Sequence, residues 1–356
     1  MERLEQRIAD KSADPQGMLG RVNALGYQMR DALAQAQSIS AEGWTRPKAV
    51  VIAGMGGSAI GADLVRGLVE DQLPVPIMVN RDYRLPGFVD EDTLVIASSY
   101  SGGTEETLSA YEHARQLGAS VAVTTTGGEL GRRAEKAGLP VVTIPKGLQP
   151  RAALAYSLVP LLVLLHRAGL VDDPAADVEE AASLLDERRS RLGPEAPVSD
   201  NPAKGLALTH YGGLPLIYGS PGWKAAVAYR WKCQVNENAK AAAVWNVLPE
   251  LNHNETEGWQ YPELNRHVHV VMLADDGDPE PIRRRMDATA AVMEGRVGSI
   301  QRVSSEGKSP LARMMSLVQM ADYVSVYLAL LYGVDPTPVT AIEDLKRRLA
   351  APGSGS

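Results

Sequence analysis

Short apolar runs alternate with helical stretches along most of the chain. Strands of a parallel sheet are covered on both faces, so their sequences are nearly continuous apolar runs. Such runs occupy residues 49–53, 75–79, 93–97, 121–124, 141–145, 214–218, 268–273 and 299–303. Strands that alternate with helices indicate crossover connections, which are typical of parallel sheets with helices on both faces. The pattern therefore predicts an α/β fold with two doubly wound parallel sheets.

The stretches between these runs have the spacing of helices. Residues up to about Gly43 are predicted to be helical, because Met18, Val22, Leu25 and Met29 recur about once per turn. Further helices are predicted over residues 58–70, 105–117, 152–165, 279–294, 311–332 and 341–349, and from residue 223 onward.

A strand–glycine–helix unit occurs twice, once from Val50 through Gly57 and again from Leu214 through Gly222. We interpret the repeat as two similar α/β halves, related like an internal duplication. The predicted organisation is an N-terminal helical segment (1–43), a first α/β domain (44–170), a helical connector (171–202), a second α/β domain (203–350) and a disordered tail (351–356).

Composition and charge narrow the functional classes. The 356 residues are 45% hydrophobic and 22% charged, which suffices for sizeable cores. A net charge of −7 argues against a protein that neutralises nucleic-acid phosphates, and the single cysteine, Cys233, excludes a disulfide framework. The charged start is unlike a signal peptide, and the longest uncharged run, 152–165, is too short to cross a membrane. We therefore expect a soluble, cytoplasmic protein without nucleic-acid or membrane partners.

The first predicted strand ends in a glycine-rich turn, in which Gly56, Gly57 and Ser58 are candidate binding residues. Glycines between a strand and a helix let the backbone approach a ligand closely, and the helix N-terminus offers N–H groups to an anion. The turn also fits the loose dinucleotide fingerprint G-x-G-x-x-A, with Arg81 and Asp82 placed to recognise a nicotinamide cofactor. The alternative is a tight turn that binds nothing.

A hydroxyl-rich loop, residues 99–104 (Ser-Tyr-Ser-Gly-Gly-Thr), follows the third strand and opens a helix. The hydroxyls of Ser99, Ser101 and Thr104 suit the oxygens of one phosphate monoester, and a pyrophosphate-binding fold has no need of this second cradle. The simpler alternative is that Ser101 or Thr104 only caps the helix, with Glu105 and Glu106 offsetting its dipole.

These loops resemble those of the sugar isomerase domain family, whose phosphate loop typically reads S-x-S-G-x-T. The wider resemblance is to the bifunctional phosphoglucose/phosphomannose isomerases of that family, and it extends from the N-terminal helices to about Leu349. The matching strings are residues 56–58, 99–104, 150–152, 236–240 and 249–255. Gly103 departs from the pattern, because many relatives carry asparagine there. The resemblance implies two doubly wound parallel-sheet sugar isomerase domains with flanking helices.

The resemblance also implies roles for four residues. Glu237 would be the base that moves a proton between adjacent sugar carbons, and Arg151 would stabilise the enediolate. His253 would help to open the sugar ring, reaching the site from the partner subunit. Lys346 would hydrogen-bond near the ring oxygen. Without the resemblance, Glu237 and His253 would be interpreted as solvated side chains, and Lys346 as one of several basic residues on an exposed face.

A metal site is the alternative for His253, together with Glu255 or with His267 and His269. No third ligand at a suitable spacing is evident in the sequence, and the chemistry implied by the resemblance needs neither a metal nor a cofactor.

The predicted function is an aldose–ketose isomerase that interconverts glucose 6-phosphate and/or mannose 6-phosphate with fructose 6-phosphate, acting as a homodimer with its active site at the interface. The alternatives are a non-catalytic sugar-phosphate sensor and an NAD(P)-dependent dehydrogenase. A sensor would keep the hydroxyl loop but have no use for Glu237 and His253 together.

Overall fold

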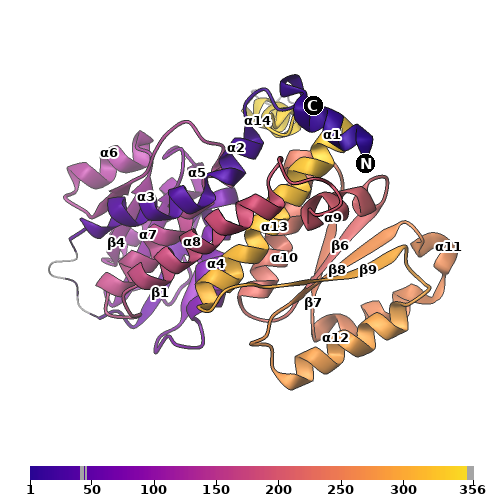
Figure 1. Ribbon diagram of the computed structural model, residues 1–356. Coiled ribbons are helices and arrows are strands. Elements are labelled where there is room, and N and C mark those ends of the chain that lie inside the picture. The colour runs from indigo at the N-terminus through magenta and orange to yellow at the C-terminus, as the bar shows by residue number, and fades with distance from the viewer. Residues whose placement is uncertain (41–43, 45, 351–356) are drawn as a thin grey trace, which may run out of the picture.

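The computed structural model describes residues 1–40, 44 and 46–350 (Figure 1). The predicted tail, 351–356, and the predicted end of the N-terminal segment, 41–43, lie outside the described residues. That N-terminal segment is helical, as predicted, and forms α1 (Glu2–Ala9), the short 3₁₀ turn η1 (Lys11–Ala13), α2 (Met18–Asn23) and α3 (Leu25–Gln37).

The first half forms a five-stranded parallel sheet with the order β2-β1-β3-β4-β5. Its strands are β1 (Ala49–Ala53), β2 (Ile77–Asn80), β3 (Thr93–Ser99), β4 (Ser120–Thr125) and β5 (Val141–Thr143). Its helices are α4 (Gly56–Val69), α5 (Glu105–Gln116), α6 (Gly128–Lys136), the 3₁₀ turn η2 (Pro150–Ala152) and α7 (Leu154–Arg167). The chain moves outward in opposite directions from β1 and β3, so a crevice forms where these neighbouring strands end.

Two helices, α8 (Ala175–Leu192) and α9 (Pro202–His210), lead to the second sheet, which is also parallel and has the order β7-β6-β8-β9. Its strands are β6 (Leu214–Gly219), β7 (Val244–Val247), β8 (Val268–Ala274) and β9 (Ser299–Ser304). The remaining elements are α10 (Trp223–Gln234), the π-helical turn η3 (Val235–Ala239), the 3₁₀ turns η4 (Glu250–His253) and η5 (Glu255–Gln260), α11 (Pro262–Asn265), α12 (Glu280–Met293), α13 (Pro310–Tyr332) and α14 (Thr340–Ala350).

The strand before Pro249 was not predicted from the sequence. This strand, β7, lies at the edge of the second sheet and pairs with β6. Its side chains are half-buried or exposed, so it lacks the continuous apolar run by which the other strands were identified.

The two sheets share one central layer of helices (Figure 1). The largest core cluster contains Ile52 of β1, Ile217 of β6 and the apolar side chains of α3, α7, α8, α10 and α13. Two smaller clusters cover the outer faces, one between the first sheet and α5 and α6, the other between the second sheet and α12. The prediction of parallel sheets with helices on both faces is confirmed.

Helix α13 is long and apolar enough to span a membrane, but its most apolar window is wholly buried inside the protein. Its partners are the neighbouring helices α8, α9 and α10. The helix therefore serves as the centre of the shared core.

One core residue makes the fold sensitive to acid. His210, at the end of α9, is fully buried, and neither of its ring nitrogens has a hydrogen-bond partner. Burial, and secondarily the nearby His269, lowers the pKa of His210 to about 4. In the unfolded chain this histidine takes up a proton near pH 6.5, whereas in the folded protein it does so only near pH 4. The free energy of unfolding is therefore undiminished above pH 6.5 and declines as the pH falls towards 4.

We predict that His210→Leu reduces the loss of unfolding free energy between pH 6.5 and pH 4 by about 3 kcal/mol. Urea denaturation at several pH values measures it, with His253→Gln, at an exposed position, as the control. Parallel curves for wild type and His210→Leu would contradict the assignment.

Candidate functional site

The hydroxyl loop is held together by its own side chains. The Ser99 Oγ lies 2.9 Å from the Thr104 Oγ1 and accepts a hydrogen bond from the Gly102 N–H at 3.1 Å. The Ser101 Oγ accepts from the Gly103 N–H at 3.2 Å, and Ser101 is exposed. Thr104 is the N-cap residue of α5, but its side chain makes no capping hydrogen bond. The positive end of the α5 helix dipole therefore lies beside hydroxyl groups that do not cap the helix.

The glycine turn joins this loop to a segment further along the chain. The Ser58 Oγ, in α4, accepts from the Tyr100 N–H at 3.2 Å, which fastens the two loops to each other. A Cβ atom at Gly57 would lie 2.9 Å from the carbonyl of Pro150. Glycine is needed at position 57 because the turn η2 packs directly against it, and this contact places Arg151 beside the crevice.

Arg151 connects the two halves of the protein. Its side chain is only 6% exposed, and burial lowers the pKa of its guanidinium. The Nε donates to the Asn238 Oδ1 at 2.7 Å, and the Nη2 donates to the carbonyls of Pro336 and Thr337, each at 2.7 Å. The remaining Nη1 lies 3.3 Å from the Oε2 of Glu237. A planar guanidinium has five donors in a fixed arrangement, which suits such a multiply bonded position.

Glu237 lies in the π-helical turn η3, directly after α10. Such turns widen the helix and are frequent at functional sites. The carboxylate is 34% exposed and lines a cavity of about 480 Å³ between residues 236–242 and 338–342. It is thus accessible to a ligand while it is paired with a buried cation.

Lys240 and Asn238 are site residues that the sequence analysis did not assign, although both lie within the matching string 236–240. The Lys240 Nζ donates to the carbonyls of Glu237 at 2.5 Å and of Pro336 at 3.0 Å. Burial and the charge of Arg151 lower the pKa of Lys240 to about 8. Asn238 is buried, and its Nδ2 donates to the Ser325 Oγ at 2.9 Å. Both side chains hold η3 in place.

These contacts form a continuous path from the hydroxyl loop to Glu237. The loop is bonded to Ser58, Gly57 packs on Pro150, and Arg151 reaches the carboxylate. The path brings the predicted binding residues and two of the four predicted catalytic residues into one region at the junction of the two halves.

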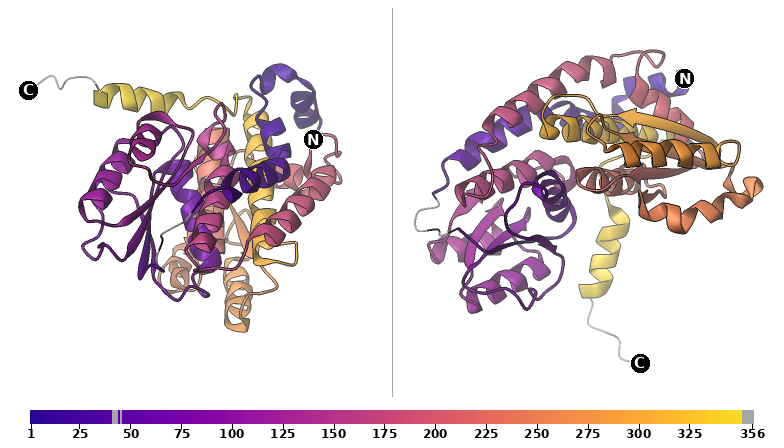
Figure 2. Two further views of the ribbon diagram at one scale, coloured as in Figure 1. Left: turned by 90° about the vertical axis from the view of Figure 1, so that its left-hand side faces the viewer. Right: turned by 90° about the horizontal axis from the view of Figure 1, so that it is seen from below.

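His253 and Lys346 lie elsewhere in the chain. His253 is exposed at the end of η4, and Lys346 is exposed on α14. Neither residue lines the cavity beside Glu237. Helix α14, which carries Lys346, extends away from the body of the protein (Figure 2).

No group of three or more His, Cys, Asp or Glu side chains among the described residues could hold a metal ion. Glu255, considered above as a partner of His253, accepts hydrogen bonds from the Tyr218 hydroxyl and the Asn246 amide instead. The Nδ1 of His269 lies 2.9 Å from the Ser299 Oγ.

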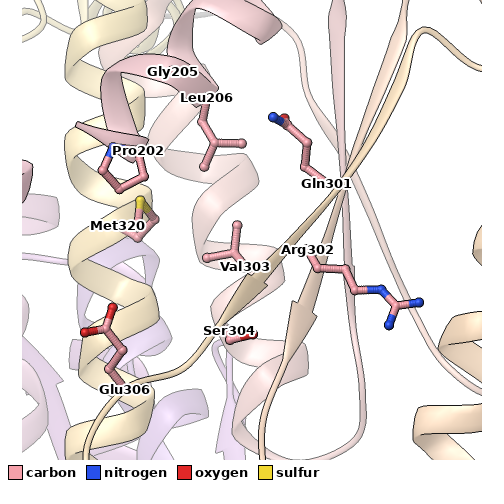
Figure 3. Close-up of a pocket in the computed structure, with 9 residues that line it drawn as sticks. All are labelled: Pro202, Gly205, Leu206, Gln301, Arg302, Val303, Ser304, Glu306 and Met320. Carbon is pink, nitrogen blue, oxygen red and sulfur yellow. The ribbon is translucent and has the colours of Figure 1, made fainter. Parts of the chain in front are cut away.

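A separate groove of about 570 Å³ lies between α9, α13 and β9 (Figure 3). Its lining is largely apolar, and its charged residues are engaged in ion pairs: Glu306 with Arg191 at 2.6 Å and Arg302 with Asp287 at 2.6 Å. None of the predicted site residues lines it. We therefore do not assign the chemistry to this groove.

Comparison with known proteins first establishes the class. The fold is shared with the crystal structure of a hypothetical protein, TT0462, from Thermus thermophilus, with a TM-score of 0.73, 18% identity, and coverage of 99% of this chain and 94% of that one. A family model described as the bacterial phospho-glucose isomerase C-terminal SIS domain matches residues 199–349. The second half of the chain thus matches a sugar isomerase (SIS) domain.

Closer relatives then define the family. The chain is 50% identical over 305 residues to the bifunctional phosphoglucose/phosphomannose isomerase of Caldicellulosiruptor bescii, covering 85% of this chain and 89% of that protein. It is 40% identical over 303 residues to the protein of the same name from Aquifex aeolicus, covering 85% and 90%. The chain belongs to the bifunctional phosphoglucose/phosphomannose isomerase family.

We predict that Arg151→Gln lowers the free energy of unfolding by about 3 kcal/mol, because it leaves several buried oxygen acceptors without a donor. Chemical denaturation measures the change. Arg347→Gln is the control: Arg347 pairs with Asp344 on the exposed face of α14, and its loss should change the unfolding free energy by no more than about 0.5 kcal/mol. Equal effects of the two substitutions would show that the Arg151 contacts are dispensable.

Proposed function

We propose that this protein is an aldose–ketose isomerase that interconverts glucose 6-phosphate and/or mannose 6-phosphate with fructose 6-phosphate. The observation that carries the proposal is the pair formed by the Arg151 guanidinium and the Glu237 carboxylate, 3.3 Å apart and contributed by different halves of the chain. The names of the relatives at 50% and 40% identity support the same reaction.

The reaction moves one proton between adjacent carbons through an enediolate. Glu237 takes the proton from C2 of the open-chain aldose and returns it to C1, while a second proton passes between the two oxygens. Negative charge accumulates on those oxygens in the transition state. A buried, permanently charged guanidinium beside the base stabilises it without reorganising, and no metal is required for this step.

The hydroxyl loop anchors the phosphate end of the substrate. Ser101 and Thr104, with Ser99 behind them, offer hydroxyls at the start of α5, where the helix dipole favours an anion. The glycine turn, with Gly56, Gly57 and Ser58, lies next to this loop and forms the other side of the proposed phosphate site. Anchoring the phosphate on the first half leaves the sugar carbons to face the second half, from which Glu237 projects.

We further propose that the enzyme acts as a homodimer in the cytoplasm and that the partner subunit completes each site. His253 and Lys346 are exposed and lie away from the cavity beside Glu237 within one chain. Helix α14 extends from the body (Figure 2), and its apolar residues Ile342, Leu345 and Leu349 are 43%, 56% and 76% exposed. Packing of this face on a second copy would bury it and bring further polar groups to the sites.

The dehydrogenase alternative is not favoured. A dinucleotide fold uses the glycines of this turn so that a pyrophosphate can approach the backbone. Here η2 occupies the space in front of Gly57, and Arg81 forms an ion pair with Asp63. A sensor that only binds sugar phosphates would, for its part, have no need of the buried Arg151 beside Glu237.

We predict that Glu237→Gln lowers kcat about a hundredfold to ten-thousandfold, the range for the loss of a positioned acid–base group. A coupled assay on glucose 6-phosphate and mannose 6-phosphate measures it. Glu257→Gln, at an exposed position on η5, is the matched control and should retain full activity. Near-normal turnover of Glu237→Gln would remove Glu237 from the mechanism.

Mixed dimers test the shared site. If Glu237 acts with the partner's His253, co-refolding inactive Glu237→Gln and His253→Ala chains in equal amounts should restore activity. Half of the dimers would then be mixed, with one intact site each, giving about a quarter of wild-type activity. If both residues serve the same chain, mixing restores nothing, and the dimeric site is refuted.

A further inference from the structure

The second sheet has its own crevice at the position that corresponds to the crevice proposed above to bind phosphate in the first. Strands β6 and β8 are neighbours, and the chain leaves them in opposite directions towards β7 and β9. Ligands of open α/β sheets bind at such switch points, outside the carboxyl ends of the strands. A cavity of about 350 Å³ lies there, lined by residues 67–72 at the end of α4, residues 220–224 after β6, residues 275–279 after β8, and the start of α13.

Three polar groups of this second crevice converge on the Asp278 carboxylate. The Oδ1 of Asp278 accepts a hydrogen bond from the Ser220 Oγ at 3.1 Å and lies 3.1 Å from the Lys224 Nζ. Its Oδ2 accepts from the Asp275 N–H at 2.9 Å. Asp278, Ser220 and Lys224 are 3%, 1% and 6% exposed. An ammonium, a hydroxyl and a backbone N–H around two oxygens are the groups with which proteins bind small oxyanions.

The corresponding loop of the first crevice, residues 100–104 after β3, carries no carboxylate. Ser58 and Ser220 both tie the first loop of their crevice to the second, but Ser58 accepts from a backbone N–H, whereas Ser220 donates to a carboxylate. The loop after β3 carries uncharged hydroxyls. The loop after β8 carries Asp275 and Asp278, and the Asp275 carboxylate accepts from the Gly277 N–H at 3.0 Å and lies 3.0 Å from the Arg313 Nε.

We propose that the second crevice is an oxyanion-binding site whose resident ligand is the protein's own Asp278 carboxylate. The site selects for small oxyanions such as a carboxylate or phosphate, and the internal carboxylate excludes free ones. Its occupation fixes the loop after β8 against α10. The loop before α10 in turn packs on α4 of the first half, where a Cβ at Gly67 would lie 2.5 Å from the Trp223 backbone nitrogen. One consequence rests on the function proposed above: because the Asp278 carboxylate occupies the second crevice, the sugar phosphate binds only in the first.

Removal of the internal ligand should open the site to external anions. We expect Asp278→Ala to lower the Tm by on the order of 5–10 °C, because Lys224 is left buried without its anion. Sodium acetate or phosphate should then raise the Tm of Asp278→Ala by several degrees more than that of the wild type, relative to sodium chloride of equal ionic strength. The comparison with wild type subtracts any binding of phosphate to the first crevice.

Asp278→Asn is the matched control, because it fills the same volume without the charge. It should also lose stability but gain no more from acetate or phosphate than the wild type does. An anion response of folded Asp278→Ala equal to that of the wild type would overturn the proposal, as would the same enhanced response in Asp278→Asn.

A double-mutant cycle tests the proposal if Asp278→Ala does not fold. Lys224→Met alone should lower the Tm, because Asp278 then lacks its cation, and Lys224→Met with Asp278→Asn should recover much of that loss. Additive losses from the two substitutions would show that Asp278 is not bound by Lys224 as a ligand, and the proposal would fail.

Discussion

The buried guanidinium of Arg151 is the interaction on which the arrangement of the site depends. A charge with so little exposure is tolerated only where its donors are satisfied. Its partners are Glu237 and Asn238 from the second half and the carbonyls of Pro336 and Thr337 before α14. One side chain of the first half therefore fixes Glu237, the proposed base, together with the turn that carries it and the segment from which the last helix extends.

The shared helical layer explains why a site at the junction of two halves can be rigid. Apolar residues of both sheets belong to one core cluster, and α4 packs directly on α10. Any displacement of one half against the other would expose part of that core to water, at a free-energy cost of roughly 25 cal/mol per Å² of apolar surface. Arg230 adds a polar connection, because it donates to the carbonyl of Arg151 at 3.1 Å and pairs with Asp322 of α13 at 2.5 Å. Positioning of the base is thus a property of the whole core.

The sequence predicted the strands best where burial is complete. Strand β1 has the predicted bounds, 49–53, and its five residues are all buried. The edge strand β7 and the helix α6 were missed, because half-exposed or glycine-rich segments lack a clear apolar period. The contact between Arg151 and Glu237 spans 86 positions, and no local pattern reports a contact at that separation. Both residues were found through the resemblance, whereas Asn238 and Lys240 lay unassigned inside the same string because their roles depend on where Pro336 and Ser325 fold.

The two crevices show how a duplicated fold can retain one ligand site. Each has a serine that ties its first loop to its second, at the ends of neighbouring parallel strands. The first carries uncharged hydroxyls and N–H groups, which suit a phosphate dianion. At the second, a phosphate beside Asp278 would face like charges about 4 Å apart, at a cost of roughly 4 kcal/mol per pair of unit charges at an effective dielectric constant near 20. Since each 1.4 kcal/mol changes an affinity tenfold, a repulsion of this size would weaken phosphate binding by several factors of ten. The acidic loop alone is therefore enough to keep a phosphate out of the second crevice, which supports the proposal that the first half holds the phosphate and the second supplies the base.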